Sequence, residues 1–374
     1  MLAIGKRKEI QVPVIWSVMG IALFLVALSL FTTAMGMAVS TIFSGHLIIG
    51  GLLALLALAI PWSLAGTFAG LAFSLMAAGV TCDRVSSLKR AYSRLLLSWD
   101  HLPLMKAGTY LSCNSDLAGL ELCDGDYDRG LDRMRKVVER LNKNPFMRQS
   151  AFVRIMNYNL AATLLRLDYL DECDRVVEGS LSIAPAVYSR WSPQRLLWHR
   201  QISNWESFQY YSLKGGLALE RGDYEVAVDL LGKGLEALQA PGFSFMILPV
   251  FKRLSMVSVL TSLVIARLEL NQKAEAVSDT RQIIEILPTC YQSGYFLLGL
   301  KDLSRLSEKL IAHKEYESAE MILQYCYASA RSSSYHPDSH LVIDAYLNLF
   351  SATERSDHLA DLRSWVLPLA IEGH

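Results

Sequence analysis

Five consecutive residues, His336-Pro337-Asp338-Ser339-His340, place two imidazoles and a carboxylate on alternate positions of the chain. Zinc accepts such ligands, so the motif could hold a metal ion if a fourth ligand came from elsewhere. The alternative is a loop between two helices, in which Asp338 or Ser339 caps the second helix. We favour the loop, because neither a fourth ligand nor a supporting partner stands near it in the sequence. We therefore expect no metal and no other cofactor.

Other reactive side chains lack the spacing of known catalytic motifs. No common phosphate-binding, zinc-protease or nucleophile-elbow signature occurs in the sequence. The six cysteines lie far apart and form no Cys-x-x-Cys pair, which is typical of free thiols in a reducing compartment. They are Cys82, Cys113, Cys123, Cys173, Cys290 and Cys326. We predict that the chain is not an enzyme and has no catalytic residues.

A tryptophan-rich stretch is a second candidate site, for ligand binding. Trp191, Trp198 and Trp205 recur there every seven residues, among several arginines. Arg and Trp are enriched at binding hot spots, so the stretch could form a ligand surface. The alternative is an inward stripe of Trp198, Ile202 and Trp205. We favour the inward stripe, since large apolar residues at helical spacing usually face a core.

The first part of the chain contains a long stretch without full charges. No Asp, Glu, Lys or Arg occurs between Glu9 and Asp83, over 73 residues. Two apolar blocks fill this stretch, at about 12–39 and 47–80. A helix needs about 20 apolar residues to cross a bilayer, which leaves room for two spans or, tightly, three.

Basic residues flank the charge-free stretch on both sides, with Lys6, Arg7 and Lys8 before it and Arg84 to Arg94 after it. Because basic flanks favour the cytoplasm, an even number of spans is indicated. We predict a transmembrane helical hairpin in residues 1–82, with both termini of the chain in the cytoplasm. The chain would then be an integral protein of a bacterial cytoplasmic membrane, in contact with lipid through this anchor.

Residues 83–110 form an amphipathic basic segment after the predicted anchor. Five apolar side chains fall on one helical face: Val85, Leu88, Tyr92, Leu95 and Trp99. Four basic residues lie beside them. One interpretation is a helix that lies on anionic lipid headgroups. The other is the first helix of a soluble domain, with its apolar face inward. Periodicity alone does not separate the two.

From residue 111 onward the sequence repeats one pattern, in which an apolar run is followed by a tight turn and then by a small residue. The turns begin at Gly125, Asp168, Gly222, Asn271, Lys314 and Arg355. Five residues after them stand Gly130, Cys173, Ala227, Ala276, Ala319 and Ala360. Seven residues before them stand Ala118, Ala161, Gly215, Val264, Ser307 and Asn348. Antiparallel helices joined by a tight turn approach closely where side chains are short, so the pattern predicts helical hairpins.

The pattern is best developed in residues 117–145, 160–185 and 213–241, and there the sequence resembles the tetratricopeptide repeat family. The resemblance implies an all-α fold over residues 111–374, an α-solenoid of about five to six helical hairpins. The small residues recur here at intervals of 41 to 54 residues, whereas the family's repeat has about 34. We expect long first helices to absorb the excess.

In solenoids of this family the first helix of each hairpin lines a concave surface that binds partners. The residues that the resemblance places in this groove are Tyr158, Arg166, Gln209, Ser212, Glu220, Thr261, Lys301 and Arg305. The implied partner is a protein or peptide. We expect no nucleic acid, because the chain has 36 basic and 36 acidic residues and therefore no basic excess.

Together these features predict a membrane-anchored scaffold or adaptor that binds a protein or peptide on the cytoplasmic side, in a secretion, envelope or signalling assembly. The alternative is a membrane-embedded enzyme subunit or sensor whose solenoid binds a small molecule or a lipid. An open, polar trough would favour peptides, while a closed apolar pocket would favour a small ligand.

Overall fold

The computed structural model describes residues 33, 37, 39–40, 77, 79–99, 108–143, 151–181, 193–240, 249–333 and 336–355. These residues are helical almost throughout, and their one β-type pairing is an isolated bridge between Thr81 and Ser293. The predicted all-α class is therefore confirmed. The two predicted membrane spans, 12–39 and 47–80, lie almost entirely outside the described residues. Thr33, Met37 and Val39 from the first span are helical.

The chain divides into two compact units. One combines residues 1–79 with 91–116, and the other combines residues 80–90 with 117–374. In the first unit the described side chains include Tyr92 and Cys113, which are both buried. Burial raises the pKa of Cys113 to about 12, so this thiol is protonated at neutral pH.

The second unit is built mainly from helix pairs that follow one another along the chain. The first helices of the pairs are α4 (Gly108–Cys123, of which residues 117–123 belong to this unit), α6 (Ala151–Arg166), α8 (Pro193–Glu220), α10 (Pro249–Glu269) and α12 (Leu300–Ala312). Their partners are α5 (Tyr127–Lys143), α7 (Leu170–Val176), α9 (Tyr224–Gln239), α11 (Lys273–Ile286) and α13 (Tyr316–Ser332). The helix α14 (Ser339–Ala352) follows the last pair.

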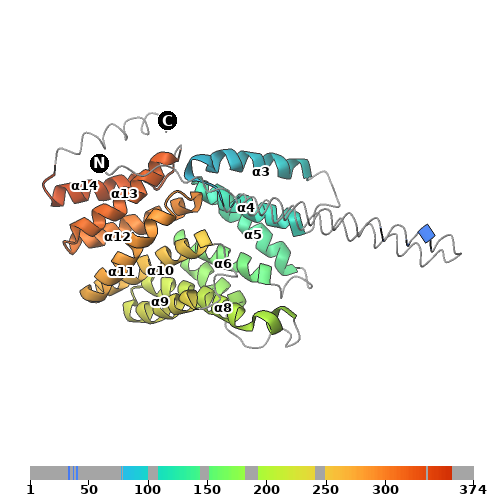
Figure 1. Cartoon of the computed structure of the whole chain (residues 1–374), viewed down its shortest axis with the longest axis horizontal. Helices are drawn as coiled ribbons and strands as arrows, with labels where there is room; N and C mark the ends of the chain where they lie inside the picture. The colour runs from blue at the N-terminus through green and yellow to red at the C-terminus, as the bar shows by residue number, and fades with distance from the viewer. Residues whose placement is uncertain are drawn as a thin grey trace. The chain divides into compact units, whose positions relative to one another are not determined.

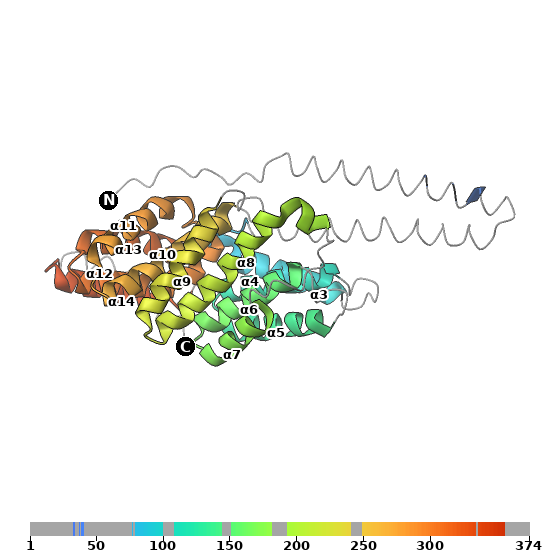
Figure 2. The same cartoon turned by 90° about the horizontal axis from the view of Figure 1, so that it is seen from below.

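Neighbouring pairs pack against one another in chain order. α6 contacts α8, α9 contacts α10, α10 contacts α12, and α12 contacts α14 (Figure 1). Seen from below, α9 lies against both α8 and α10 (Figure 2). Each pair therefore covers apolar surface of its neighbour, which is a repeat-like packing of helices.

The turns inside the pairs share one backbone conformation. The residue with a positive φ angle is Gly125, Asp168, Gly222, Asn271 or Lys314, as the sequence pattern predicts. At Gly125 the backbone N–H donates to the carbonyl of Leu122, and the next N–H, of Asp126, donates to that of Glu121. The other four turns repeat both bonds. This is the Schellman motif, which satisfies the last carbonyls of the first helix and turns the chain back.

The sixth turn departs from the prediction by one residue. Its positive φ angle falls at Glu354 rather than Arg355. Asn348, which the pattern places at a helix contact, is exposed, and Ala360 lies outside the described residues.

Close approach of the two helices explains the small residues of the pattern. Cys173, Ala227, Ala276 and Ala319 are fully buried. A Cβ atom added to Gly130 would lie 2.7 Å from the side chain of Leu122 in the preceding helix. The tight contact therefore requires a short side chain five residues after the turn.

The excess length of the repeats is absorbed in two ways. The first helix α8 has 28 residues and its partner α9 has 16, as the sequence predicts for a long first helix. Between α11 and α12 the chain instead forms two short 3-10 helices, η5 (Leu287–Thr289) and η6 (Gly294–Gly299). A π-helical turn, η3 (Val177–Leu181), extends α7.

α10 is the one helix among the described residues that is long and apolar enough to cross a membrane by length and composition. It pairs with α11, and its buried side chains run from Val257 to Leu268. Its apolar composition thus matches the core position that it occupies.

The helix α3 (Val85–Trp99) follows a short 3-10 helix, η1 (Cys82–Arg84). Its apolar side chains Val85, Tyr92 and Leu96 are buried, with at most 5% of each exposed. Of the predicted apolar face, Val85 and Tyr92 are thus buried, while Leu88 and Leu95 are half-buried and the side chain of Trp99 lies outside the described residues.

Candidate functional site

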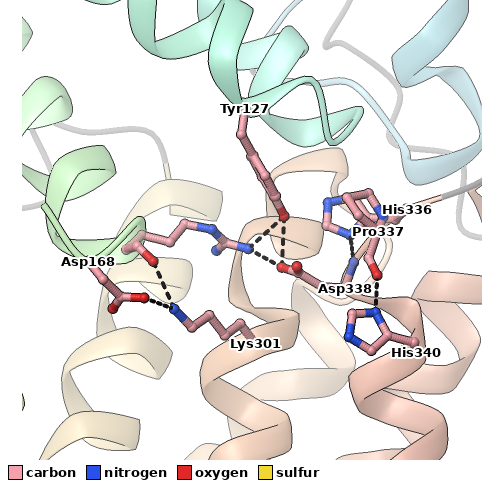
Figure 3. Close-up of polar contacts among 8 residues, drawn as sticks. Tyr127, Asp168, Lys301, His336, Pro337, Asp338 and His340 are labelled. Atoms are coloured by element: carbon pink, nitrogen blue, oxygen red, sulfur yellow. Dashed lines mark hydrogen bonds and ion pairs between the residues drawn. The ribbon is translucent and has the colours of Figure 1, made fainter.

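One network of polar side chains in the second unit joins the loop before α14 to the first two helix pairs. The carboxylate of Asp338 stands at the centre of this network (Figure 3). Its Oδ2 accepts a hydrogen bond of 2.8 Å from the hydroxyl of Tyr127, the first residue of α5. The same oxygen forms an ion pair of 2.6 Å with Arg166, the last residue of α6. One carboxylate thus ties the loop before α14 to the first two helix pairs.

This ion pair lies in a largely buried environment, with 12% of each side chain exposed. The guanidinium of Arg166 also stands over the ring of Tyr127, 5.8 Å from its centroid, a cation–π arrangement. Burial alone would lower the pKa of Arg166, but Asp302, Tyr127 and Asp338 raise it above the usual value. Burial raises the pKa of Asp302, against the opposing effect of Arg166 and Lys301.

His336 is the second buried polar group of this region, with 1% of its surface exposed. Its Nδ1 accepts the backbone N–H of Asp338 at 3.2 Å, and its ring meets that of Tyr127 edge-on, 6.2 Å between centroids. Its Nε2 is buried without a hydrogen-bond partner among the described residues. Burial lowers the pKa of His336 to about 4, so the imidazole is neutral at neutral pH.

The motif of residues 336–340 forms a loop in which the two histidines take different environments. His340 is exposed, and its Nδ1 lies 2.5 Å from the carbonyl of Pro337 (Figure 3). Asp338 occupies the N-cap position of α14, but its carboxylate bonds to Tyr127 and Arg166 instead of capping the helix. Within the described ranges, no three His, Cys, Asp or Glu side chains are placed to hold a metal ion.

A basic stripe along α12 meets the ends of three first helices. Lys301, Arg305 and Lys309 follow one another at four-residue spacing, so they share one face of the helix. Each forms an ion pair with a carboxylate at or just after the C-terminal end of α6, α8 or α10. The pairs are Lys301–Asp168 at 2.9 Å, Arg305–Glu220 at 2.5 Å and Lys309–Glu269 at 2.5 Å. Lys301 also donates to the carbonyl of Arg166 at 3.1 Å, as expected for a cation at a helix C-terminus.

Two further contacts join early and late parts of the second unit. A Cβ atom added to Gly125 would overlap the ring of Pro337, only 2.6 Å from its Cγ, so the first turn lies against the loop before α14. The segment before α3 pairs with the segment before η6. There the N–H of Cys82 donates to the carbonyl of Gln292 at 3.1 Å, and the N–H of Gly294 donates to that of Val80 at 2.8 Å.

The structure brings four of the eight predicted groove residues together in this network. Arg166, Glu220, Lys301 and Arg305 all form ion pairs within it. Their charges therefore face other residues of the same chain.

The other four predicted groove residues lie elsewhere. Gln209 and Thr261 are buried, with 0% and 1% exposed. Tyr158 packs against Trp205 and Phe208, with ring centroids 6.3 and 5.9 Å apart. Burial raises the pKa of Tyr158 to about 12, against the smaller, lowering effect of a hydrogen bond with Ser212.

Trp205 faces inward, with 7% exposed, as the favoured interpretation of the tryptophan stretch predicts. Trp191 and the side chains of Trp198 and Ile202 lie outside the described residues.

The sequence assigned Asp338 to a possible metal site or helix cap and Asp168 to a turn, and it gave no role to Tyr127 or Asp302. The four-residue spacing of Lys301, Arg305 and Lys309 was a readable signal of a basic stripe. The spacing carries no information on which carboxylates oppose it.

Comparison with protein-family models finds none that matches this chain, and comparison with curated proteins finds no match either.

Proposed function

We propose that the chain is a membrane-anchored helical-repeat adaptor that binds a protein or peptide on the cytoplasmic side. The supporting observation is the succession of helix pairs with the same Schellman turn and the same buried small residue. Such arrays present an extended surface, and most of them use it to bind partners. We further propose that the pairs form an α-solenoid of the tetratricopeptide type with lengthened repeats.

The anchor is the second part of this proposal. Its support is the charge-free stretch of 73 residues with basic flanks on both sides. A hairpin of two spans leaves both termini and the helical unit in the cytoplasm. A reporter enzyme fused after residue 110 is then active only in the cytoplasm, and activity on the other side of the membrane would exclude this topology.

Binding rather than catalysis is favoured by how the reactive groups are used. Burial raises the pKa of Cys82, Cys173 and Cys290 to about 12, so these thiols are poor nucleophiles at neutral pH. Arg166, Asp338 and Lys301 bond to residues of their own chain. We propose that they hold the shape of the binding surface and that the partner contacts exposed side chains around them.

Photo-crosslinking in intact membranes tests the proposal. A photoreactive amino acid replaces exposed side chains on different elements, one per variant: Tyr169, Val226, Met321 and Leu347, which are 48%, 52%, 38% and 38% exposed. We expect the positions that lie on the binding surface to capture one and the same protein. Positions that lie away from this surface should capture none.

A variant of the polar network tests whether capture depends on the shape of the surface. The variant Asp338→Asn, which removes the charge at the centre of the polar network, should lose the crosslinked product while the chain remains in the membrane. If every position gives no discrete protein product in a folded, membrane-inserted chain, the adaptor function is excluded.

A further inference from the structure

The helix α3 has two chemically different faces. The inner face carries the buried side chains Val85, Tyr92 and Leu96. The exposed residues of the helix follow one another at three- and four-residue spacing and therefore share the opposite face: Ser87, Arg90, Ala91, Arg94 and Leu97. Three apolar side chains thus share a buried face, and the five exposed residues lie on the opposite face.

The outer face carries unpaired positive charge. Arg84 just before the helix, together with Arg90 and Arg94 on it, is exposed, and none of the three forms an ion pair or side-chain hydrogen bond with the described residues. Lys89, by contrast, is half-buried and pairs with Asp124. The neighbouring acidic group, Asp83, accepts a hydrogen bond of 2.6 Å from the hydroxyl of Thr81. Three arginines therefore remain available to an anionic partner.

The same face also exposes a large apolar side chain. Leu97 is 65% exposed, more than any other large hydrophobic residue in the described part of the chain. Basic residues close to an anionic membrane surface are attracted to it, and an exposed apolar side chain beside them adds buried apolar area on contact with lipid. An arginine there can extend its apolar stem along the lipid while its guanidinium bonds to a phosphate in bidentate fashion.

In the sequence, α3 follows directly after the proposed membrane anchor. The charge-free stretch ends at Cys82, and the helix begins three residues later, at Val85. If that stretch is the anchor, as the proposed function holds, the helix starts within a few ångströms of the headgroup layer.

From these observations we infer that the outer face of α3 docks on anionic phospholipid headgroups of the membrane that holds the chain. The inference deepens the proposed function and rests on its anchor. The face differs from the one that amphipathicity suggested, because Val85 and Tyr92 of the predicted apolar face are buried and Leu88 and Leu95 are half-buried. The headgroup phosphate is the recognised chemistry.

The test uses the full chain in lipid nanodiscs with and without phosphatidylglycerol. All six native cysteines are buried, so the variant Leu97→Cys accepts a thiol-reactive, environment-sensitive fluorophore selectively. We expect its emission to shift to the blue, and to be quenched by spin-labelled lipid, only in the discs that contain phosphatidylglycerol. Salt at about 1 M, where the Debye length is about 3 Å, should abolish both signals.

Charge removal on this face should weaken the contact by a measurable factor. Each basic residue near an anionic surface contributes about a fivefold preference, so Arg90→Gln with Arg94→Gln should lower the ratio of bound to free label roughly 25-fold. The matched control is Lys136→Gln with Lys143→Gln, which removes two exposed charges from α5. This control should leave the Leu97→Cys signal unchanged, and a label at Val226→Cys should respond to no lipid.

The outcomes separate this inference from the anchor. A chain that floats with the discs while its label at position 97 stays unquenched overturns the inference and leaves the anchor in place. Equal quenching in neutral and anionic discs, insensitive to the arginine variants, overturns it as well. Quenching of a chain that alkaline carbonate extracts supports the inference and overturns the anchor. A chain that neither floats nor shows quenching overturns both.

Discussion

Asp338 accepts two bonds from residues that lie 211 and 172 positions earlier in the chain, Tyr127 and Arg166. The ion pair between Asp338 and Arg166 is mostly shielded from water, so each of the two charges needs the other as its partner. Removing one charge leaves the other without this partner in a largely buried environment, which is costly.

We therefore expect Asp338→Asn to lower the free energy of unfolding by about 3 kcal/mol, the lower end for a broken buried pair, because Asp302 remains near Arg166. Tyr127→Phe, which removes one hydrogen bond, should cost about 1 kcal/mol. Urea denaturation measures both values.

The control for this prediction is Asp132→Asn, which breaks an exposed pair with Lys136 and should cost less than about 0.5 kcal/mol. Equal effects of the Asp338 and Asp132 substitutions would contradict the role of Asp338.

The second prediction at this scale concerns acid. The pKa of His336 is near 6.5 in the unfolded chain, and burial lowers the pKa to about 4 in the folded chain, so below pH 6.5 the unfolded state binds more protons. Its contribution to stability is complete above pH 6.5 and is lost as the pH falls towards 4. Between pH 7 and pH 5 this loss is about 2 kcal/mol.

His336→Asn keeps an acceptor for the N–H of Asp338 and removes the titration. We expect the difference in unfolding free energy between wild type and this variant to change by that amount from pH 7 to pH 5. His340→Asn, on the exposed histidine of the same loop, serves as the control. A constant difference between wild type and His336→Asn would contradict the prediction.

The residues of this region show where the sequence was informative and where it was not. The spacing of His336, Asp338 and His340 drew attention to the right loop and allowed a loop between helices. Their partners could not be read, because Tyr127 and Arg166 come close only through the packing of the complete unit.

At the scale of elements, the hairpin turns were the most predictable part of the chain. A residue that tolerates positive φ and a small residue five positions later are both local requirements, so they are written in adjacent sequence. The positions of the 3-10 helices before α12 and of the basic stripe against α6, α8 and α10 depend on distant chain segments. For this reason neither position could be predicted from the sequence.

Gly125 and Gly222 allow a matched test of one turn against another, since their φ angles are 81° and 82°. At Gly222 an added Cβ meets nothing within 4 Å, so Gly222→Ala should cost only the strain of the left-handed conformation, about 1 kcal/mol. At Gly125 the added Cβ overlaps Pro337, which should cost about 2 kcal/mol more.

Thermal and urea unfolding of the two alanine variants measure this difference. Gly222→Asn should be nearly neutral, because Asn271 adopts the same conformation in another turn of this chain. Equal losses for Gly125→Ala and Gly222→Ala would show that the first turn does not bear on the loop before α14.

At the scale of the second unit, the ends of the helix array are tied together. Arrays of repeats with contacts only between neighbours open from their ends, because each pair depends on one interface at a time. Here Asp338 and Pro337 join the last loop to the first two pairs, and the segment at 80–82 joins the one at 292–294. Opening of the last helix therefore requires these ties to break as well.

We expect amide hydrogen exchange to show α14 and α6 protected to within about 1 kcal/mol of each other in the wild type. In Asp338→Asn the exchange of α14 should become faster than that of α6 by at least tenfold, because the end of the array is released. Mass spectrometry of the full chain resolves the two helices. Faster exchange of α14 already in the wild type would contradict the coupling of the ends.

The hydrogen bond between Tyr127 and Asp338 can form only late in the synthesis of the chain, because 211 residues separate its two partners. A ribosome adds about 5–20 residues per second, so the 211 residues between these two take roughly 10–40 s to emerge. In that interval each completed hairpin can fold, but Arg166 has no counter-ion from the last loop. A nascent chain that stops short of residue 336 therefore lacks the contacts of Asp338 with Tyr127 and Arg166, and incompletely folded chains of this kind are the substrates of chaperones and proteases.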